Sequence, residues 1–306
     1  MDARIARGFG AVTTILAIVN EVPLAHWRIQ AGLEMRQALL LNTSLFNSEA
    51  WHGISSLEEG LLERVDNALL RGLLKSHAKI PTEALHLETG TISVKYILKS
   101  RRLGYLQNIL KKDEEELVSE IYNAQKNSPH DGDFCKLVEM DKALVNLTIT
   151  DSEISNMKVE QYKNKVKSKV RNAAFSDLLI KKVSHSKMDD VSYDKLELQE
   201  YMRSPLFDKE SVAMLLALRT RTVRGIKNDF RGMFPDVLCP LGCGETDTLK
   251  NVLSCSVLRN NCESVTMHEV KFDDIFSPDI TKQKQITQLY IQLMDIREKI
   301  INNSPE

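Results

Sequence analysis

The chain has 306 residues, of which 42% are hydrophobic and 27% are charged, and its formal net charge is −1. This composition supplies enough apolar side chains for a core, so it excludes a chain that is disordered over most of its length. A net charge close to zero also excludes a general attraction to nucleic acid, so that any basic surface has to be local. Only 13 glycines and 8 prolines punctuate the sequence, which favours a mostly α fold.

Apolar residues recur at helical spacing along most of the chain. The first apolar segment, 4–20, superficially resembles a signal peptide, but it continues into further helix and its apolar run is far short of the ~20 residues that span a membrane. We therefore expect no membrane partner. The clearest amphipathic helix covers 57–74. Further helices are expected at 24–45, 82–87, 94–110, 113–126, 134–147, 152–183 (with Asp151 as its cap), 209–233 and 280–302, and a polar linker at 185–194.

Four of the five cysteines fall within 239–262, which favours a local metal cluster in a reducing compartment over a disulfide scaffold. The protein is therefore expected inside the cell, in the nucleus or the cytoplasm. Cys239 and Cys243 lie one tight turn apart, and Cys255 ends the apolar segment that follows. This order is typical of a small zinc module, except that Asn251 stands where a histidine ligand is expected, and an amide is a poor zinc ligand.

Two interpretations of the cysteine segment stay open. Cys239, Cys243 and Cys255 hold zinc together with a fourth group, for which Cys262 or His268 is a candidate; a site of four thiolates that includes Cys262 is physically reasonable. Alternatively, the segment is a metal-free remnant held by apolar packing. The fifth cysteine, Cys135, is expected to be a buried small hydrophobe.

Basic residues concentrate in two segments. Residues 158–182 contain eight basic and two acidic side chains, and residues 219–231 contain five basic and one acidic. Each segment is either a solvated helix or a surface for nonspecific contact with phosphates, whose affinity would fall steeply with salt. The candidate phosphate contacts are Lys163, Lys167 and Arg171 in the first segment and Arg219, Arg221 and Arg224 in the second.

Several phrases occur in an order that resembles the C-terminal part of a reverse transcriptase from a non-LTR retrotransposon, running from the thumb to a zinc-knuckle tail. The phrases are Leu24-Ala-His-Trp-Arg-Ile, Ala38-Leu-Leu-Leu-Asn42, Asn47-Ser-Glu-Ala-Trp-His52, Leu62-Glu-Arg-Val-Asp66, Leu87-Glu-Thr-Gly90, Arg101-Arg-Leu-Gly-Tyr-Leu106, Gly132-Asp-Phe134, Leu218-Arg-Thr-Arg221 and the cysteine segment with Asp247-Thr248. The resemblance implies a thumb-like helical domain at 1–133, a helical connector with basic segments at 134–232, and a degenerate zinc knuckle with a C-terminal helix at 233–306.

The same resemblance places Arg101 and Arg102 on a thumb-like helix, where they either follow the template–primer backbone or pair with the acidic segment 113–116. The family's catalytic centre is an aromatic-x-Asp-Asp motif upstream of the thumb, and this motif is absent from the sequence. The adjacent aspartates here, Asp189-Asp190 and Asp273-Asp274, do not lie in an apolar hairpin that could hold two metal ions.

The resemblance therefore predicts a fragment that is not an enzyme and that grips RNA or DNA backbone without reading sequence. An upstream palm domain or a second copy of the chain is a candidate partner. The alternative is a decayed or co-opted helical module that contacts proteins and does not bind nucleic acid.

Overall fold

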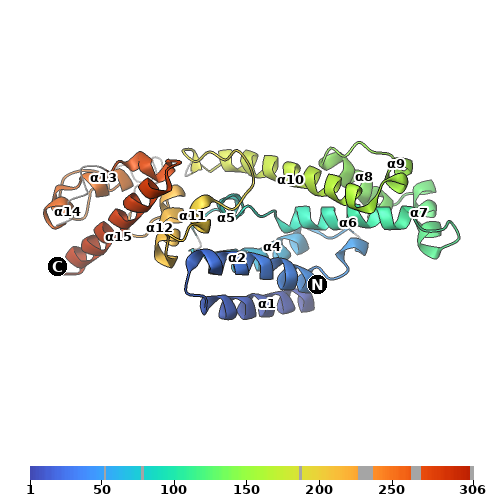
Figure 1. Ribbon diagram of the computed structural model, residues 1–306, viewed down its shortest axis with the longest axis horizontal. Coiled ribbons are helices and arrows are strands. Elements are labelled where there is room, and N and C mark those ends of the chain that lie inside the picture. The colour runs from blue at the N-terminus through green and yellow to red at the C-terminus, as the bar shows by residue number, and fades with distance from the viewer. Residues whose placement is uncertain (52, 77–78, 186–187, 227–236, 263–269, 304–306) are drawn as a thin grey trace. The chain divides into compact units, whose positions relative to one another are not determined.

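The computed structural model describes residues 1–51, 53–76, 79–185, 188–226, 237–262 and 270–303, which form helices joined by loops (Figure 1). The predicted mostly α fold is confirmed. The described residues contain no strand, only two isolated bridges, Thr89 with Leu198 and Leu238 with Thr246. The helices are α1 (Asp2–Asn20), α2 (Ala25–Met35), a π-helical turn (Arg36–Leu40), α3 (Leu41–Ser44), a 3-10 turn (Ser48–Ala50), α4 (Ser56–Leu74), α5 (Thr82–Thr89), α6 (Val94–Leu110), α7 (Leu117–Asn127), α8 (Phe134–Leu144), α9 (Asp151–Asn156), α10 (Val159–Val183), α11 (Glu200–Arg203), α12 (Lys209–Arg219), α13 (Leu249–Ser254), α14 (Ser256–Asn260), a second 3-10 turn, η5 (Phe272–Phe276), and α15 (Ile280–Asn303).

The chain forms two compact units that alternate along the sequence. Unit 1 consists of Met1–Ala17, Leu33–Leu69 and Gly90–Ile180, and unit 2 consists of Ile18–Gly32, Leu70–Thr89 and Lys181–Glu306. The segments expected from the sequence, 1–133, 134–232 and 233–306, are each continuous, so their boundaries differ from those of the units.

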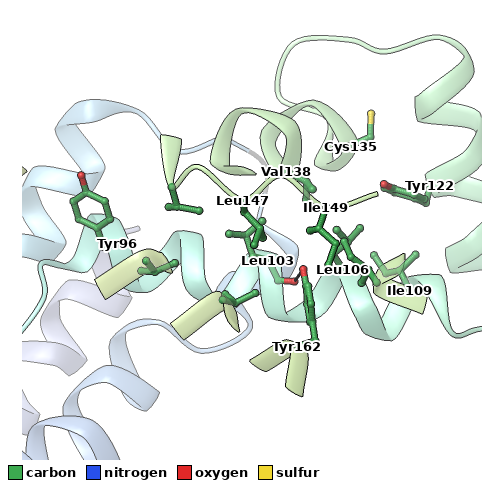
Figure 2. Close-up of a cluster of buried hydrophobic side chains, with 14 of the residues drawn as sticks. Tyr96, Leu103, Leu106, Ile109, Tyr122, Cys135, Val138, Leu147, Ile149 and Tyr162 are labelled. Atoms are coloured by element: carbon green, nitrogen blue, oxygen red, sulfur yellow. Dashed lines mark hydrogen bonds between the residues drawn. The ribbon is translucent and has the colours of Figure 1, made fainter. Parts of the chain in front are cut away.

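The main core of unit 1 gathers side chains from α6 to α10 (Figure 2). Helix α10 contributes a buried stripe at every fourth residue, which is the spacing that keeps side chains on one face of a helix. Tyr162 in this stripe is fully buried, and its hydroxyl donates to the carbonyl of Leu103 at 2.9 Å. Cys135 of α8 lies in the same core, as expected for a small hydrophobe, so the expected boundary at 133/134 falls inside this core.

Helix 152–183, expected to be continuous, is interrupted. Thr150, and not Asp151, caps α9, because its hydroxyl accepts from the backbone N–H of Glu153. The Glu153 carboxylate in turn accepts from the backbone N–H of Thr150, which completes a capping box. Asp151 instead forms ion pairs with Lys126 and Lys142, at 2.9 and 2.8 Å. Burial alone would raise the pKa of Asp151, but these two ammonium groups lower that pKa to about 2.

In unit 2, α15 packs against α11, α12, α13, α14 and η5. Its buried face includes Tyr290, whose hydroxyl donates to the carbonyl of Leu249 at 2.7 Å and so fixes α15 to the first residue of α13. The expected polar linker 185–194 also contributes to the buried interior of the chain: Met188 and Val191 are buried, and Tyr193 donates to Glu88.

The helix expected at 209–233 ends at Arg219. Arg221 has a left-handed backbone, with φ 48°, and two hydrogen bonds close the end of α12: Thr222 N–H to Ala217 and Arg221 N–H to Leu218. This pairing is the Schellman motif, which satisfies carbonyls at the end of a helix. The remainder of the expected helix, from residue 227 on, lies outside the described residues.

Gly32 of α2 lies directly against Leu73 of α4 within unit 2. A Cβ at Gly32 would come within 2.2 Å of a Leu73 methyl, and Leu73 is itself 1% exposed. Gly32→Ala is expected to lower the free energy of unfolding by about 1–3 kcal/mol, because the buried Leu73 side chain has to move. Gly60→Ala in the exposed interior of α4, where the added Cβ would meet no atom outside its own helix turn within 4 Å, is the control and should raise the free energy of unfolding by about 0.5–1 kcal/mol. Equal effects of the two substitutions in urea unfolding would contradict this packing.

Candidate metal centre

A tight turn brings the first two cysteines of the cluster together. The backbone N–H of Cys239 donates to the carbonyl of Glu245 at 2.8 Å, and the N–H of Gly242 donates to the carbonyl of Cys239 at 3.0 Å. Gly242 and Gly244 have φ of 75° and 83°, a conformation that glycine adopts without strain. The two glycines therefore let the chain reverse direction around Cys243.

Helix α13 supplies the third cysteine and Asn251. Thr248 caps this helix by accepting from the backbone N–H of Asn251 at 3.0 Å. Cys255 follows Asn251 by four residues, and its N–H donates to the Asn251 carbonyl at 2.7 Å. Residues four apart share one face of a helix, so Asn251 and Cys255 face the turn together.

The sulfur atoms of Cys239, Cys243 and Cys255 all lie within 4.8 Å of one another. The Sγ atoms of Cys239 and Cys255 are 4.0 Å apart. Zn–S bonds of about 2.3 Å at tetrahedral angles separate sulfurs by about 3.8 Å, so this spacing suits a cation held between thiolates. Cys239 and Cys255 are buried and Cys243 is half-buried. The cluster predicted from the sequence is therefore close enough to hold a metal ion.

The thiols of the cluster differ in acidity. Burial raises the pKa of Cys255 to about 11. Burial also acts to raise the pKa of Cys243, but the backbone N–H of Glu245 and the neighbouring cysteine and Asn251 side chains outweigh it, so the pKa is lowered. A metal cation binds thiolates, so its binding to this site has to release protons.

Asn251, and not Cys262, is the fourth side chain that lies beside the three sulfurs. The Asn251 side chain is 5% exposed, and its Oδ1 and Nδ2 atoms lie 3.6 and 3.7 Å from Cys243 Sγ. Cys262 follows α14 and is half-buried. Among the described residues, its sulfur does not belong to the group of side chains that lie close enough together to share a metal ion. The other candidate, His268, lies outside the described part of the chain.

A buried ion pair ties the cysteine loop to the C-terminal helix. Arg297 of α15 donates to Asp247 Oδ1 at 2.6 Å and to the carbonyl of Gly225 at 3.2 Å. Asp247 and Arg297 are each 1% exposed. Asp247 directly precedes Thr248, so Arg297 supports the start of α13 and hence the position of Asn251. The sequence interpretation missed this pair, although Arg297 continues the apolar spacing of Ile286, Tyr290 and Leu293 on α15.

Two arginines expected to contact phosphates are buried. Arg102 pairs with Asp141 at 2.6 Å and is 7% exposed; Arg219 pairs with Glu88 at 2.8 Å and is 6% exposed. A buried guanidinium that is already paired is not placed to meet a phosphate, which corrects the expectation for both residues. Arg102 also does not pair with the acidic segment 113–116, the alternative that the sequence left open.

Arg101 and Arg221 are bound within their own units. Arg101 donates to the carbonyls of Leu41, the first residue of α3, and Leu45, which directly follows α3. Arg221 pairs with Asp190. Arg221 lies in the turn after α12, so it and Arg224 are not on one helix, although the sequence predicted a helix over 209–233. Arg224 is exposed in this turn.

The basic residues of α10 remain at the surface. Lys163 and Lys167 are exposed one helical turn apart, and no carboxylate in the described part of the chain lies within ion-pair distance of either. Arg171 follows one turn later; it is half-buried and donates to the carbonyl of Gly90 at 3.2 Å. These three side chains lie on one side of the buried stripe of α10.

Neither aspartate pair forms a two-metal site among the described residues. Asp274 accepts from the backbone N–H of Lys271 and caps its own 3-10 turn. Asp190 is the partner of Arg221.

No helix in the described ranges is long and apolar enough to cross a membrane. No family model matches the chain, and no curated protein and no solved structure matches it either.

Proposed function

We propose that the chain is a non-catalytic part of a retroelement reverse transcriptase, resembling its thumb and tail, which contacts nucleic-acid backbone and carries a zinc-stabilised C-terminal module. The observation that carries the proposal is the cluster of Cys239, Cys243 and Cys255, whose sulfurs lie within 4.8 Å of one another. The order of these cysteines and the position of Asn251 are those of a zinc knuckle with its histidine replaced. All three cysteines are free of disulfides, and free thiols are available to bind a metal.

Three thiolates fit Zn²⁺, which accepts sulfur ligands readily. Bound zinc would supply a cross-link between the Cys239–Cys243 turn and α13, and so contribute free energy to the folding of the C-terminal module. The chain's own residues prepare this link: Gly242 and Gly244 turn the backbone, and Thr248 fixes the start of α13. Within the described residues, the side chains grouped at this centre are three cysteines with no carboxylate or histidine among them, and we assign the centre a structural role.

Contact with nucleic acid is assigned to α10. Lys163 and Lys167 are exposed and free of ion pairs with carboxylates of the described residues, and their charges can displace the counterions of a phosphate backbone. Arg171 and the exposed Arg224 are further cations at the surface of their units. Phosphate contacts of this kind carry no base readout, so binding is expected to be indifferent to sequence.

Replacing both lysines, Lys163→Gln with Lys167→Gln, is expected to weaken binding to single-stranded RNA and duplex DNA about equally. Each lost phosphate contact should reduce the slope of log affinity against log salt by about 0.7–0.9. Fluorescence anisotropy over a salt series measures this slope. The control is Lys112→Gln with Lys136→Gln, which removes the same charge from two lysines of unit 1 that pair with Glu116 and Asp131. An equal loss of affinity in both double variants would contradict a nucleic-acid contact surface on α10.

A second candidate function is protein contact without nucleic-acid binding. Helix α7 favours it, because Leu117 and Ile121, four residues apart, are 68% and 49% exposed. This alternative is supported if filter binding at low salt retains no nucleic acid while light scattering detects self-association. Retention at low salt by a monomeric chain supports the nucleic-acid assignment instead.

A further inference from the structure

Asn251 holds a fixed place beside the three thiols. Its backbone N–H is bound by Thr248, its side chain is 5% exposed, and its amide lies 3.6–3.7 Å from Cys243 Sγ. The side-chain amide of Asn251 is therefore confined against the sulfur of Cys243. Because Asn251 already lies next to the thiols, the donor chemistry of its amide decides whether it binds the metal.

A carboxamide oxygen competes poorly for a cation that already has three thiolate ligands. Hard oxygen donors suit Mg²⁺ and Ca²⁺, whereas thiolates select softer cations. Three thiolates around Zn²⁺ also leave one excess negative charge, which favours a hydrogen-bond donor next to sulfur. The Nδ2 of Asn251 is such a donor toward Cys243. Hydrogen bonds of this kind tune a metal centre without filling a coordination position.

We propose that Asn251 does not ligate the metal and that no side chain among the described residues fills the fourth coordination position of the three-cysteine centre, which is then open to an exchangeable small ligand, such as water or a free thiol. Asn251 is then a positioning residue that donates to the Cys243 thiolate. The proposal rests on the proposed zinc-binding function. Closed structural sites have four protein ligands, and sites with three keep a position for an external one. The metal in this chain therefore exchanges faster than in a site that has a histidine at position 251.

Cobalt provides the test, because the visible spectrum of Co²⁺ bound to thiolates reports its coordination. The full chain is loaded with Co²⁺ and titrated with imidazole, and the Zn²⁺-loaded chain is mixed with a chelator to measure metal release. We expect imidazole to change the spectrum of the unsubstituted chain saturably. Asn251→His should abolish this change and slow zinc release by about tenfold or more, since the added ring closes the fourth position.

Two further variants separate the outcomes. Asn251→Ala keeps the open position, so it should still respond to imidazole even if the histidine variant folds poorly. Asn260→His, on the exposed end of α14, adds the same ring away from the cluster and should behave as the unsubstituted chain. A spectrum that imidazole leaves unchanged in both the unsubstituted chain and Asn251→Ala would overturn the proposal, because a protein group then closes the site. If no cobalt–thiolate absorption forms at all, the zinc-binding function itself fails.

Discussion

Cys255→Ser is expected to remove metal binding and to unfold the C-terminal module. Cys255 is 1% exposed and provides one of only three thiols in the cluster, so its loss leaves two thiolates beside Asn251, whose amide is a poor zinc ligand. Metal affinities of structural zinc sites correspond to about 10–16 kcal/mol, much of which stabilises the fold. We expect the zinc content to fall from about one equivalent to near zero. Metal analysis of the purified protein and hydrogen exchange over α13 and α14 measure both effects.

Cys262→Ser is the matched control for this substitution. It removes the same atom from the neighbouring half-buried cysteine, which lies outside the three-thiol group. Its zinc content should equal that of the unsubstituted chain. If Cys262→Ser loses zinc to the same extent as Cys255→Ser, the centre is a four-thiolate site and the geometry around Asn251 is not the one that binds metal.

Asp247→Ala is expected to cost about 3–5 kcal/mol of unfolding free energy, because it leaves the Arg297 guanidinium buried without its carboxylate. The pair is 2.6 Å apart with side chains 2% and 1% exposed, so the guanidinium is shielded from bulk solvent. The effect should concentrate on α13 and α15, which the pair joins through the loop before Thr248. Urea unfolding of the zinc-loaded protein measures the loss, and hydrogen exchange locates it.

The exposed pair on the same helix is the control. Asp295→Ala removes the carboxylate that Lys299 contacts at 2.7 Å, but these side chains are 61% and 69% exposed. Solvent screens such a pair, so the cost should stay below about 0.5 kcal/mol. Similar costs for Asp247→Ala and Asp295→Ala would show that the buried pair does not support the module.

Apolar periodicity was sufficient to predict the long helices. The segments 94–110 and 280–302 became α6 (Val94–Leu110) and α15 (Ile280–Asn303), and neither contains a proline that would end the helix early. The end of α12 could not be predicted. Arg221 adopts a left-handed conformation that glycine usually takes, so the sequence carries no glycine signal at that position. The start of α9 was misassigned by one residue, since Thr150 and Asp151 are both good caps and only tertiary contacts with lysines engage Asp151.

The candidate site was predictable where its residues are close in sequence. The spacing of the cysteines, together with the position of Asn251, indicates a cluster because a tight turn and a helical i,i+4 pair are local features. Whether an arginine is buried in an ion pair or exposed depends on partners that are distant in the sequence. Arg102 and Arg219 meet carboxylates 39 and 131 residues away, so no local pattern distinguishes them from the exposed Lys163 and Lys167.

The two proposed activities rest on different units and can be tested independently. Helix α10 contributes Lys163 and Lys167 to unit 1, whereas the three cysteines belong to unit 2. We therefore expect Cys255→Ser to leave the contribution of the two lysines to the salt dependence intact, and the double lysine variant to retain full zinc content. A variant that loses both its zinc and the lysine contribution to the salt dependence would indicate general unfolding and not the loss of one site.

The most direct measurement of the central claim is the zinc-to-protein ratio of the full chain purified under reducing conditions without chelator. The three-cysteine centre predicts a ratio of about one that falls to near zero in Cys255→Ser and is unchanged in Cys262→Ser. A ratio near zero in the unsubstituted chain that added Zn²⁺ does not raise would contradict the account, since the clustered thiols would then be a metal-free remnant held by packing alone.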